Sequence, residues 1–427
     1  MKRKIILILI VIVIIGFGLC FKLFPKNQIG QAENVINTEQ GIVNSKIEDL
    51  DFLCDNLEMK HKNLYGKVSK EEFLCEKQKV IDKIDDLSES QFYFELKHLI
   101  SLVGDGHTNI TYKGLLYEHL PVLCFSIRKF DDGWHLTKLE EENSRYLGYL
   151  LTEINNVSIE DIYEKAKSII SYDNETWRQV QFSSTVNLYD ALEYLGVLQG
   201  EEEVNLTLKK DRSGEEENLI LKPLYQKDME DSDVAEFQQK ETPITAMKGI
   251  YNSCPIDENI YYIQYNMCSE DPDLTIKDFT KKISNDLKNN SYKKLIIDLR
   301  YNTGGNSDIL APVIKCISNY KKNNKLDIYT LIGEKTFSSA VINSIELKDE
   351  LNATLVGSET GGSVNCYGEI KTFDLPNLPM TVIYSTKYFE LIKGYNKDSL
   401  CPDIPVEKSF ENYKNGIDSD LEAILKL

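Results

Sequence analysis

Two short segments of this chain carry residue types that could perform nucleophilic catalysis. Residues 298–305 (Asp-Leu-Arg-Tyr-Asn-Thr-Gly-Gly) end an apolar run with two glycines, and such a turn can point backbone N–H groups at an anion. Residues 336–340 (Thr-Phe-Ser-Ser-Ala) place Ser338 between a second apolar run and a helical pattern. Because a helix N-terminus stabilises negative charge, this serine is suited to act as a nucleophile. Together the segments predict a serine hydrolase.

These segments resemble the motifs of the C-terminal processing, or tail-specific, serine peptidase family, which also has tricorn and retinoid-binding branches. Residues 357–362 (Gly-Ser-Glu-Thr-Gly-Gly) add to the resemblance, which extends over roughly residues 50–425. It implies Ser338 as the nucleophile and peptides or unfolded polypeptide segments as substrates. It also implies a crotonase-like α/β core for the peptidase domain.

The same resemblance assigns the oxyanion hole to the backbone N–H groups of Gly304 or Gly305 and of Ser339. We expect Asp298 and Arg300 to fix the end of the strand, and Asn302 to shape the glycine turn. The structural alternative is that the glycines only make a tight turn and that the serine is an ordinary helix N-cap.

The residue that activates the serine is less evident. The tail-specific branch uses a lysine at the position that holds Ser363 here, so a Ser-Lys pair is in doubt. Lys335 and Lys371 lie nearby in the sequence, but an exposed lysine is a poor base near neutral pH. Histidine is the alternative base.

The chain has five histidines, all in its first third. His107 follows a helical pattern that ends at Gly104, and it lies in a tight turn, Asp-Gly-His-Thr, over residues 105–108. The tricorn-like branch carries its catalytic histidine at a similar place, which implies His107 as the base. His61 and His98 fit the apolar stripes of packed helices. His119 and His135 are weaker candidates for the base.

A serine-histidine pair needs a third group to orient the imidazole. The tricorn-like branch has an acid shortly before a Pro-Asp pair, which corresponds to residues 402–403 here. The resemblance therefore favours Asp398, with Glu390 and Asn396 as alternatives.

The N-terminus predicts membrane attachment. Residues 1–4 carry basic side chains, and the apolar run 5–21 is at the lower limit of length for crossing a bilayer. No small-residue cleavage site follows, so we expect residues 1–24 to form an uncleaved anchor, with the body outside the cytoplasm. Cleavage of this segment would instead give a secreted protein.

The remaining chain predicts a mixed α/β, multi-domain protein, in which strand-like runs, the last of them at residues 380–385, alternate with helical stretches. After a spacer (25–45), we expect a helical region with the candidate histidine (46–118), a PDZ-like β-rich domain (119–225), an acidic linker (226–245) and the peptidase core (246–427). Residues 147–162 predict a strand, a turn at Asn155 and Asn156 and then a helix, a pattern that resembles a PDZ hairpin. Residues 172–200 are an insertion relative to that pattern. A PDZ-like domain would bind peptides by adding a β-strand.

Composition limits the other classes of function. The net charge of −19 argues against nucleic acid or an anionic membrane surface as the main partner of the body. The cysteines show no C-x-x-C pair, and no Cys/His ligand spacing is present, so we expect no cofactor and no zinc. The leading alternative to a peptidase is a non-catalytic binding protein on the same scaffold.

Overall fold

The computed structural model of the protein describes residues 39–114, 119–212, 214–225 and 234–427. The predicted anchor (1–24) lies outside these residues. Within the described parts of the chain, no helix is both long and apolar enough to cross a membrane. The last residues of the predicted spacer are helical, because the first described helix already begins at Glu39.

An N-terminal helical region comes first along the chain. It contains α2 (Glu39–Lys60), α3 (Lys70–Ile81) and α4 (Glu89–Ser101). Helices α3 and α4 both begin with a capping box, in which Ser69 or Ser88 exchanges hydrogen bonds with the residue three positions later. The buried faces of the three helices share one apolar core with Ile110 and Tyr112, which follow the His107 turn.

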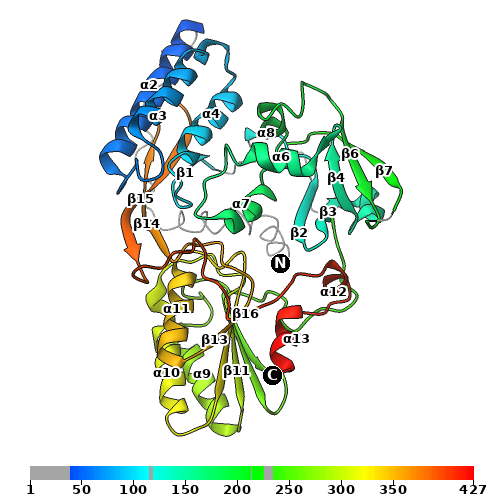
Figure 1. The fold of residues 1–427 in the computed structure, drawn as a ribbon, viewed down its shortest axis with the longest axis vertical. Helices are drawn as coiled ribbons and strands as arrows, with labels where there is room; N and C mark the ends of the chain where they lie inside the picture. The colour runs from blue at the N-terminus through cyan, green and yellow to red at the C-terminus, as the bar shows by residue number, and fades with distance from the viewer. Residues whose placement is uncertain (1–38, 115–118, 213, 226–233) are drawn as a thin grey trace.

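A small antiparallel sheet joins this region to the peptidase core, in the order β1-β15-β14 (Figure 1). Its strands are β1 (Asn109–Tyr112), β14 (Asn365–Asp374) and β15 (Met380–Glu390). Residues 380–385 therefore form the predicted strand, but outside the main sheet, because β15 pairs with β1 and β14. Asn109 lies opposite Ile383, so the turn just before β1 is fixed beside the C-terminal half of the chain.

The middle region is a sheet of antiparallel strands covered by helices. Its elements are β2 (Phe125–Phe130), β3 (Gly133–Glu140), β4 (Leu150–Ile154), β5 (Val157–Ser158), α6 (Ile159–Ala166), α7 (Glu175–Phe182), α8 (Tyr189–Tyr194), β6 (Val204–Lys209) and β7 (Glu216–Leu221). The predicted strand, Asn-Asn turn and helix over residues 147–162 are confirmed, with Asn155 and Asn156 at φ 45° and 62°. The insertion 172–200 supplies α7 and α8.

Strand β8 (Val234–Glu236) pairs with β3, so part of the predicted linker adds to the middle sheet. The chain then enters the C-terminal sheet, in the order β16-β13-β12-β11-β10-β9. Its strands are β9 (Tyr251–Pro255), β10 (Ile260–Tyr265), β11 (Lys294–Asp298), β12 (Asp327–Ile332), β13 (Thr354–Gly357) and β16 (Ile404–Pro405). All neighbours pair in parallel except β9 and β10, as the α/β pattern predicted.

Helices cover both faces of this sheet (Figure 1). They are α9 (Ile276–Asn289), α10 (Ala311–Lys321) and α11 (Ser339–Leu351) on one face and α13 (Ser419–Leu425) on the other. The short helix α12 (Phe410–Lys414) instead contacts Phe130 and His135 of the middle sheet. Alternate residues of β10 and β11 pack on opposite sides, since Tyr261 and Leu295 join the core beneath α9, α10 and α11, whereas Tyr262 and Ile296 pack with α13. Burial on both faces explains the nearly unbroken apolar runs of these strands.

Candidate active site

Ser338 lies in the turn between β12 and α11, where its backbone is strained. It is the N-cap of α11 with φ 53° and ψ −126°, a conformation that a residue with a Cβ adopts at a cost. Its side chain makes no capping hydrogen bond, and the residue is only half-buried. The ordinary N-cap alternative therefore does not hold, because the hydroxyl is not used to cap the helix.

The glycine turn after β11 packs directly against this serine. Gly304 has φ 108°, and a Cβ placed on it would come within 2.7 Å of the Ser338 Cβ and 3.1 Å of the Ser339 nitrogen. Gly305 has φ 132°, and a Cβ there would come within 2.3 Å of the Cys268 carbonyl oxygen. Both positions exclude any side chain, so the glycines allow this turn to approach the Ser338 turn and the Cys268 backbone closely.

The hydrogen bonds of this turn decide which N–H groups can reach an oxyanion. Gly304 donates its N–H to Asn302 Oδ1 at 2.9 Å, so it is not available, contrary to its predicted place in the oxyanion hole. The same bond confirms that Asn302 shapes the turn. Gly305 forms a bridge with Cys268 whose two hydrogen bonds do not use the Gly305 N–H. Ser339 Oγ donates to the Gly305 carbonyl at 2.7 Å and so holds the two segments together.

The end of β11 is held by a buried ion-pair network. Arg300 donates to both carboxylate oxygens of Asp298 and also binds Asp418 and Asp420, which precede and begin α13. The predicted fixing of the strand end by Asp298 and Arg300 is thus confirmed, whereas the part played by the two C-terminal aspartates was not predicted.

His107 is buried, with 4% of its surface exposed, and it lies beside the nucleophile turn. Its ring centroid is 4.6 Å from that of Phe337, the residue before Ser338. The antiparallel pairing of β1 with β15 brings it there, because β1 begins two residues after it. Neither ring nitrogen has a hydrogen-bond partner among the described residues, so both remain open to a substrate or to the serine hydroxyl. A hydrogen bond between a catalytic base and its serine often forms fully only when substrate binds.

The other four histidines have their own partners. His98 lies 2.9 Å from the Ser168 carbonyl, His119 lies 3.2 Å from the Lys113 carbonyl, and His135 contacts the Gly148 carbonyl and Asp132. His61 follows the end of α2. Its Nδ1 accepts from the Asn63 N–H, so its Nε2 carries the proton and donates to Asp105 at 3.1 Å.

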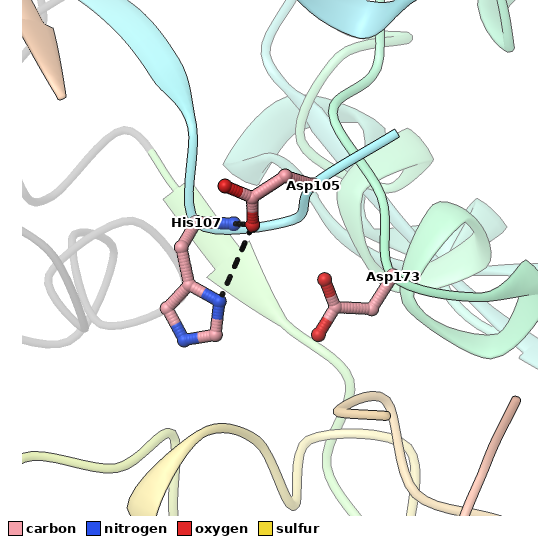
Figure 2. A group of neighbouring side chains, drawn as sticks. All are labelled: Asp105, His107 and Asp173. Carbon is pink, nitrogen blue, oxygen red and sulfur yellow. Dashed lines mark hydrogen bonds and ion pairs between the residues drawn. The ribbon is translucent and has the colours of Figure 1, made fainter. Parts of the chain in front are cut away.

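Two buried carboxylates flank His107, from Asp105 and Asp173 (Figure 2). The His107 Nδ1 is 3.7 Å from Asp105 Oδ1, which is an ion-pair distance and too long for a hydrogen bond. Asp105 is otherwise occupied, because it accepts from the His107 backbone N–H at 2.9 Å and from Thr108 Oγ1 at 2.5 Å. Oxygen and imidazole donors of this kind could also hold a divalent cation.

Asp173 reaches the site from the middle region of the chain. Its carboxylate accepts from the Gly106 N–H at 2.7 Å and from the Ser363 N–H at 3.3 Å. Ser363 occupies the position of the lysine in the tail-specific branch. In this chain the Ser363 N–H instead binds the carboxylate of Asp173, which lies near the candidate base His107.

The charges of this group shift one another's pKa values. Burial disfavours the His107 imidazolium, but Asp105 and Asp173 outweigh burial and raise its pKa above the ordinary 6.5. Burial opposes ionisation of Asp105, but the nearby His107 imidazole and the hydrogen bond from His61 lower its pKa overall. Burial raises the pKa of Asp173 more than the nearby imidazole lowers it. A histidine between two acids is suited to accept a proton and hold it.

The predicted third residues lie outside this buried group. Asp398, Glu390 and Asn396 all have exposed side chains. The Asp398 backbone carbonyl accepts a hydrogen bond from Asn174 at 3.4 Å. The Pro-Asp acid, Asp403, has a structural role, since its carboxylate binds Lys348 and the Leu355 N–H.

The candidate lysines differ in their surroundings. Lys371 is exposed on β14, opposite Tyr384. Lys335 is half-buried, and burial together with the charges of Arg128 and Lys138 lowers its pKa to about 8. Lys335 is therefore the competing base that an experiment must test.

The aromatic contacts next to Ser338 were not predicted from the sequence. Trp177 of α7 stacks on Phe337 with ring centroids 4.1 Å apart, and Phe337 in turn contacts His107. Nothing in the local sequence pattern singles out Asp173 or Trp177. Their proximity to the site depends on how the insertion 172–200 docks in three dimensions.

Comparisons with known proteins agree with this architecture. Residues 259–406 match the family model described as Peptidase family S41. The chain is similar to the crystal structure of mature CPAF, with a TM-score of 0.64 and 14% identity over 90% of this chain and 97% of that chain. The structure of mature CPAF complexed with lactacystin gives a TM-score of 0.62 and 15% identity over the same shares. The photosystem II D1 C-terminal processing protease has a TM-score of 0.42 and 13% identity, over 92% of this chain and 97% of that chain. No curated protein sequence is significantly similar to this chain.

Proposed function

Since residues 259–406 match Peptidase family S41, we propose that this serine-type peptidase cleaves peptide bonds through an acyl-enzyme on Ser338 with His107 as general base. The observation that carries this proposal is the contact between the His107 ring and Phe337, which puts the imidazole beside the strained Ser338 turn. Two acids next to the imidazole favour the protonated form that the reaction generates.

In the first step His107 takes the proton from Ser338 Oγ as the oxygen attacks the carbonyl carbon of the scissile bond. The carbonyl oxygen becomes an oxyanion, and we assign its stabilisation to the N–H groups of Gly305 and Ser339, whose turns the Ser339 Oγ–Gly305 carbonyl hydrogen bond holds together. The imidazolium then gives its proton to the leaving amine as the carbon–nitrogen bond breaks. Water, activated by the same histidine, hydrolyses the ester and restores the serine.

The substrate is a peptide or protein, as the family implies. We infer that peptides or unfolded polypeptide segments are the substrates, as the family resemblance implies. The proposed location is the outer face of a membrane, with residues 1–24 as the anchor, and it rests on the basic and apolar pattern of that segment alone.

Fluorophosphonate labelling of the body from residue 39 onward tests the mechanism. We expect wild-type protein to be labelled and both Ser338→Ala and His107→Ala to lose labelling, while thermal unfolding of the variants stays close to that of wild type. His119→Ala is the matched control, because this half-buried histidine contacts Lys113 and Tyr112, away from Ser338, and should label normally.

A binding protein on the same scaffold is the alternative function. It predicts a well-folded wild type that is not labelled, and tight binding of peptides that remain intact. Labelling that survives Ser338→Ala would contradict the assignment of the nucleophile.

A further inference from the structure

The inserted segment that carries Asp173 is bound to two turns of the peptidase core. Asn174 caps α7 by accepting from the Trp177 N–H at 2.9 Å, and its amide donates to the Thr360 carbonyl at 3.1 Å. Trp177 stacks on Phe337, and a Cβ on Gly361 would lie 2.7 Å from the Trp177 ring. The start of α7 is therefore fixed against both the nucleophile turn and the turn after β13.

This docking holds the Asp173 carboxylate in one place. Its two oxygens accept backbone N–H groups from Gly106 and Ser363, which belong to the histidine turn and to the core. A Cβ on Gly106 would come within 2.8 Å of Asp173 Oδ1, so the glycine allows the carboxylate to lie against the histidine turn. Asp173 has 5% of its surface exposed, and one of its carboxylate oxygens lies within 4.8 Å of a His107 ring nitrogen.

Few other ionisable groups face His107. Asp105 lies on its own turn, and the further side chains around the two acids are His61, which donates to Asp105, and Cys366 of β14. Burial and the two nearby carboxylates raise the pKa of Cys366, so its thiol stays neutral. The charge around the imidazole therefore comes from Asp105 and Asp173.

Asp105 is the less adaptable of the two acids. It accepts hydrogen bonds from His61, Thr108 and the His107 backbone, and these bonds shape the turn itself. Asp173 is bound only by backbone N–H groups, and it comes from a different part of the chain.

We propose that Asp173, presented by the docked start of α7, is the acid that positions His107 during catalysis, in place of the exposed Asp398. The inference rests on the proposed function of His107 as the base. It means that the middle region of the chain contributes a residue to the active site, which is complete only when α7 is docked on the core.

The first test follows the titration of His107 itself and needs no activity. Histidines labelled with ¹³C at the ring carbon are observed by NMR in a Ser338→Ala background, and the His107 signal is assigned by its loss in His107→Ala. Asp173→Asn removes the charge with little change of shape, so the His107 titration midpoint should fall relative to the parent. Asp398→Asn is the matched control and should leave the midpoint unchanged. An unchanged midpoint in Asp173→Asn, or an equal shift in both variants, would overturn the proposal.

The second test measures the rate of fluorophosphonate labelling in the otherwise wild-type protein. Asp173→Asn should reduce the rate by on the order of 100-fold or more, as expected for loss of the acid that orients a catalytic histidine, and Asp398→Asn should not. Gly106→Ala is a second variant that displaces the carboxylate and keeps its charge, so a slower rate is expected there too. If wild type is not labelled, the proposed function fails, whereas a labelled Asp173→Asn variant at the wild-type rate refutes only the role of Asp173.

Discussion

Gly304→Ala tests whether the close packing of the glycine turn against Ser338 sets the geometry of the nucleophile. The added Cβ would lie 2.7 Å from the Ser338 Cβ, whereas carbon atoms normally pack at about 3.5–4.0 Å, so the serine turn must move by about 1 Å. A displacement of about 1 Å at a reacting group costs roughly 100-fold in rate, or about 2.7 kcal/mol of transition-state stabilisation. The φ of 108° adds backbone strain of about 1–2 kcal/mol to the folded state.

The assay is the second-order rate of fluorophosphonate labelling, measured together with the thermal unfolding midpoint. Gly249→Ala is the matched control, since Gly249 has φ 63° and no neighbouring atom within 4 Å of an added Cβ. We expect both variants to lose a little stability, and only Gly304→Ala to label about 100-fold more slowly. A folded Gly304→Ala protein that labels at the wild-type rate would refute the reasoning, and so would an equal loss in Gly249→Ala.

Three further predictions follow from the charged groups. Lys335→Ala should label at the wild-type rate; a complete loss would make Lys335 the base instead of His107. The labelling rate of wild type should fall as the pH drops through a midpoint above 6.5, because the two acids raise the His107 pKa. Only the neutral imidazole can accept the serine proton, so a midpoint below 6.5 would contradict this reasoning. Arg300→Met should lower the free energy of unfolding by about 3–5 kcal/mol in a denaturant titration, because it leaves Asp298, Asp418 and Asp420 buried without their cation. A change below about 1 kcal/mol would show that water replaces the guanidinium group.

The nucleophile and glycine turns were predictable because their conformations depend on local residue types. Two adjacent glycines after an apolar strand specify a turn with positive φ, and the structure has φ 108° and 132° there. The position of Ser338 between a strand and a helix could be predicted because a short apolar run precedes it and apolar residues at helical spacing follow it. The strands of the C-terminal sheet were predictable for the same reason, since each is a short apolar run between turn signals.

The details of donors and acceptors were not predictable from the same motifs. Gly304 was expected to contribute its N–H to an oxyanion hole, but Asn302 takes that N–H. The side-chain conformation of an asparagine is set by its packing, here by its contact with the Tyr265 carbonyl, which lies on another strand. Likewise β15 was recognised as a strand, but its sheet was not, because pairing partners far apart in the chain leave no local pattern.

The sequence by itself determined the class of chemistry, the nucleophile turn and the narrow choice of histidines, because each of these depends on residue types at short spacing. Only the tertiary structure decided which groups surround the histidine. Asp173 and Ser363 are 190 residues apart, and they meet because α7 docks on the core through the Trp177 and Phe337 rings. The energy of that docking comes from apolar burial, which is not directional, so the sequence could not show which carboxylate would be buried beside the imidazole.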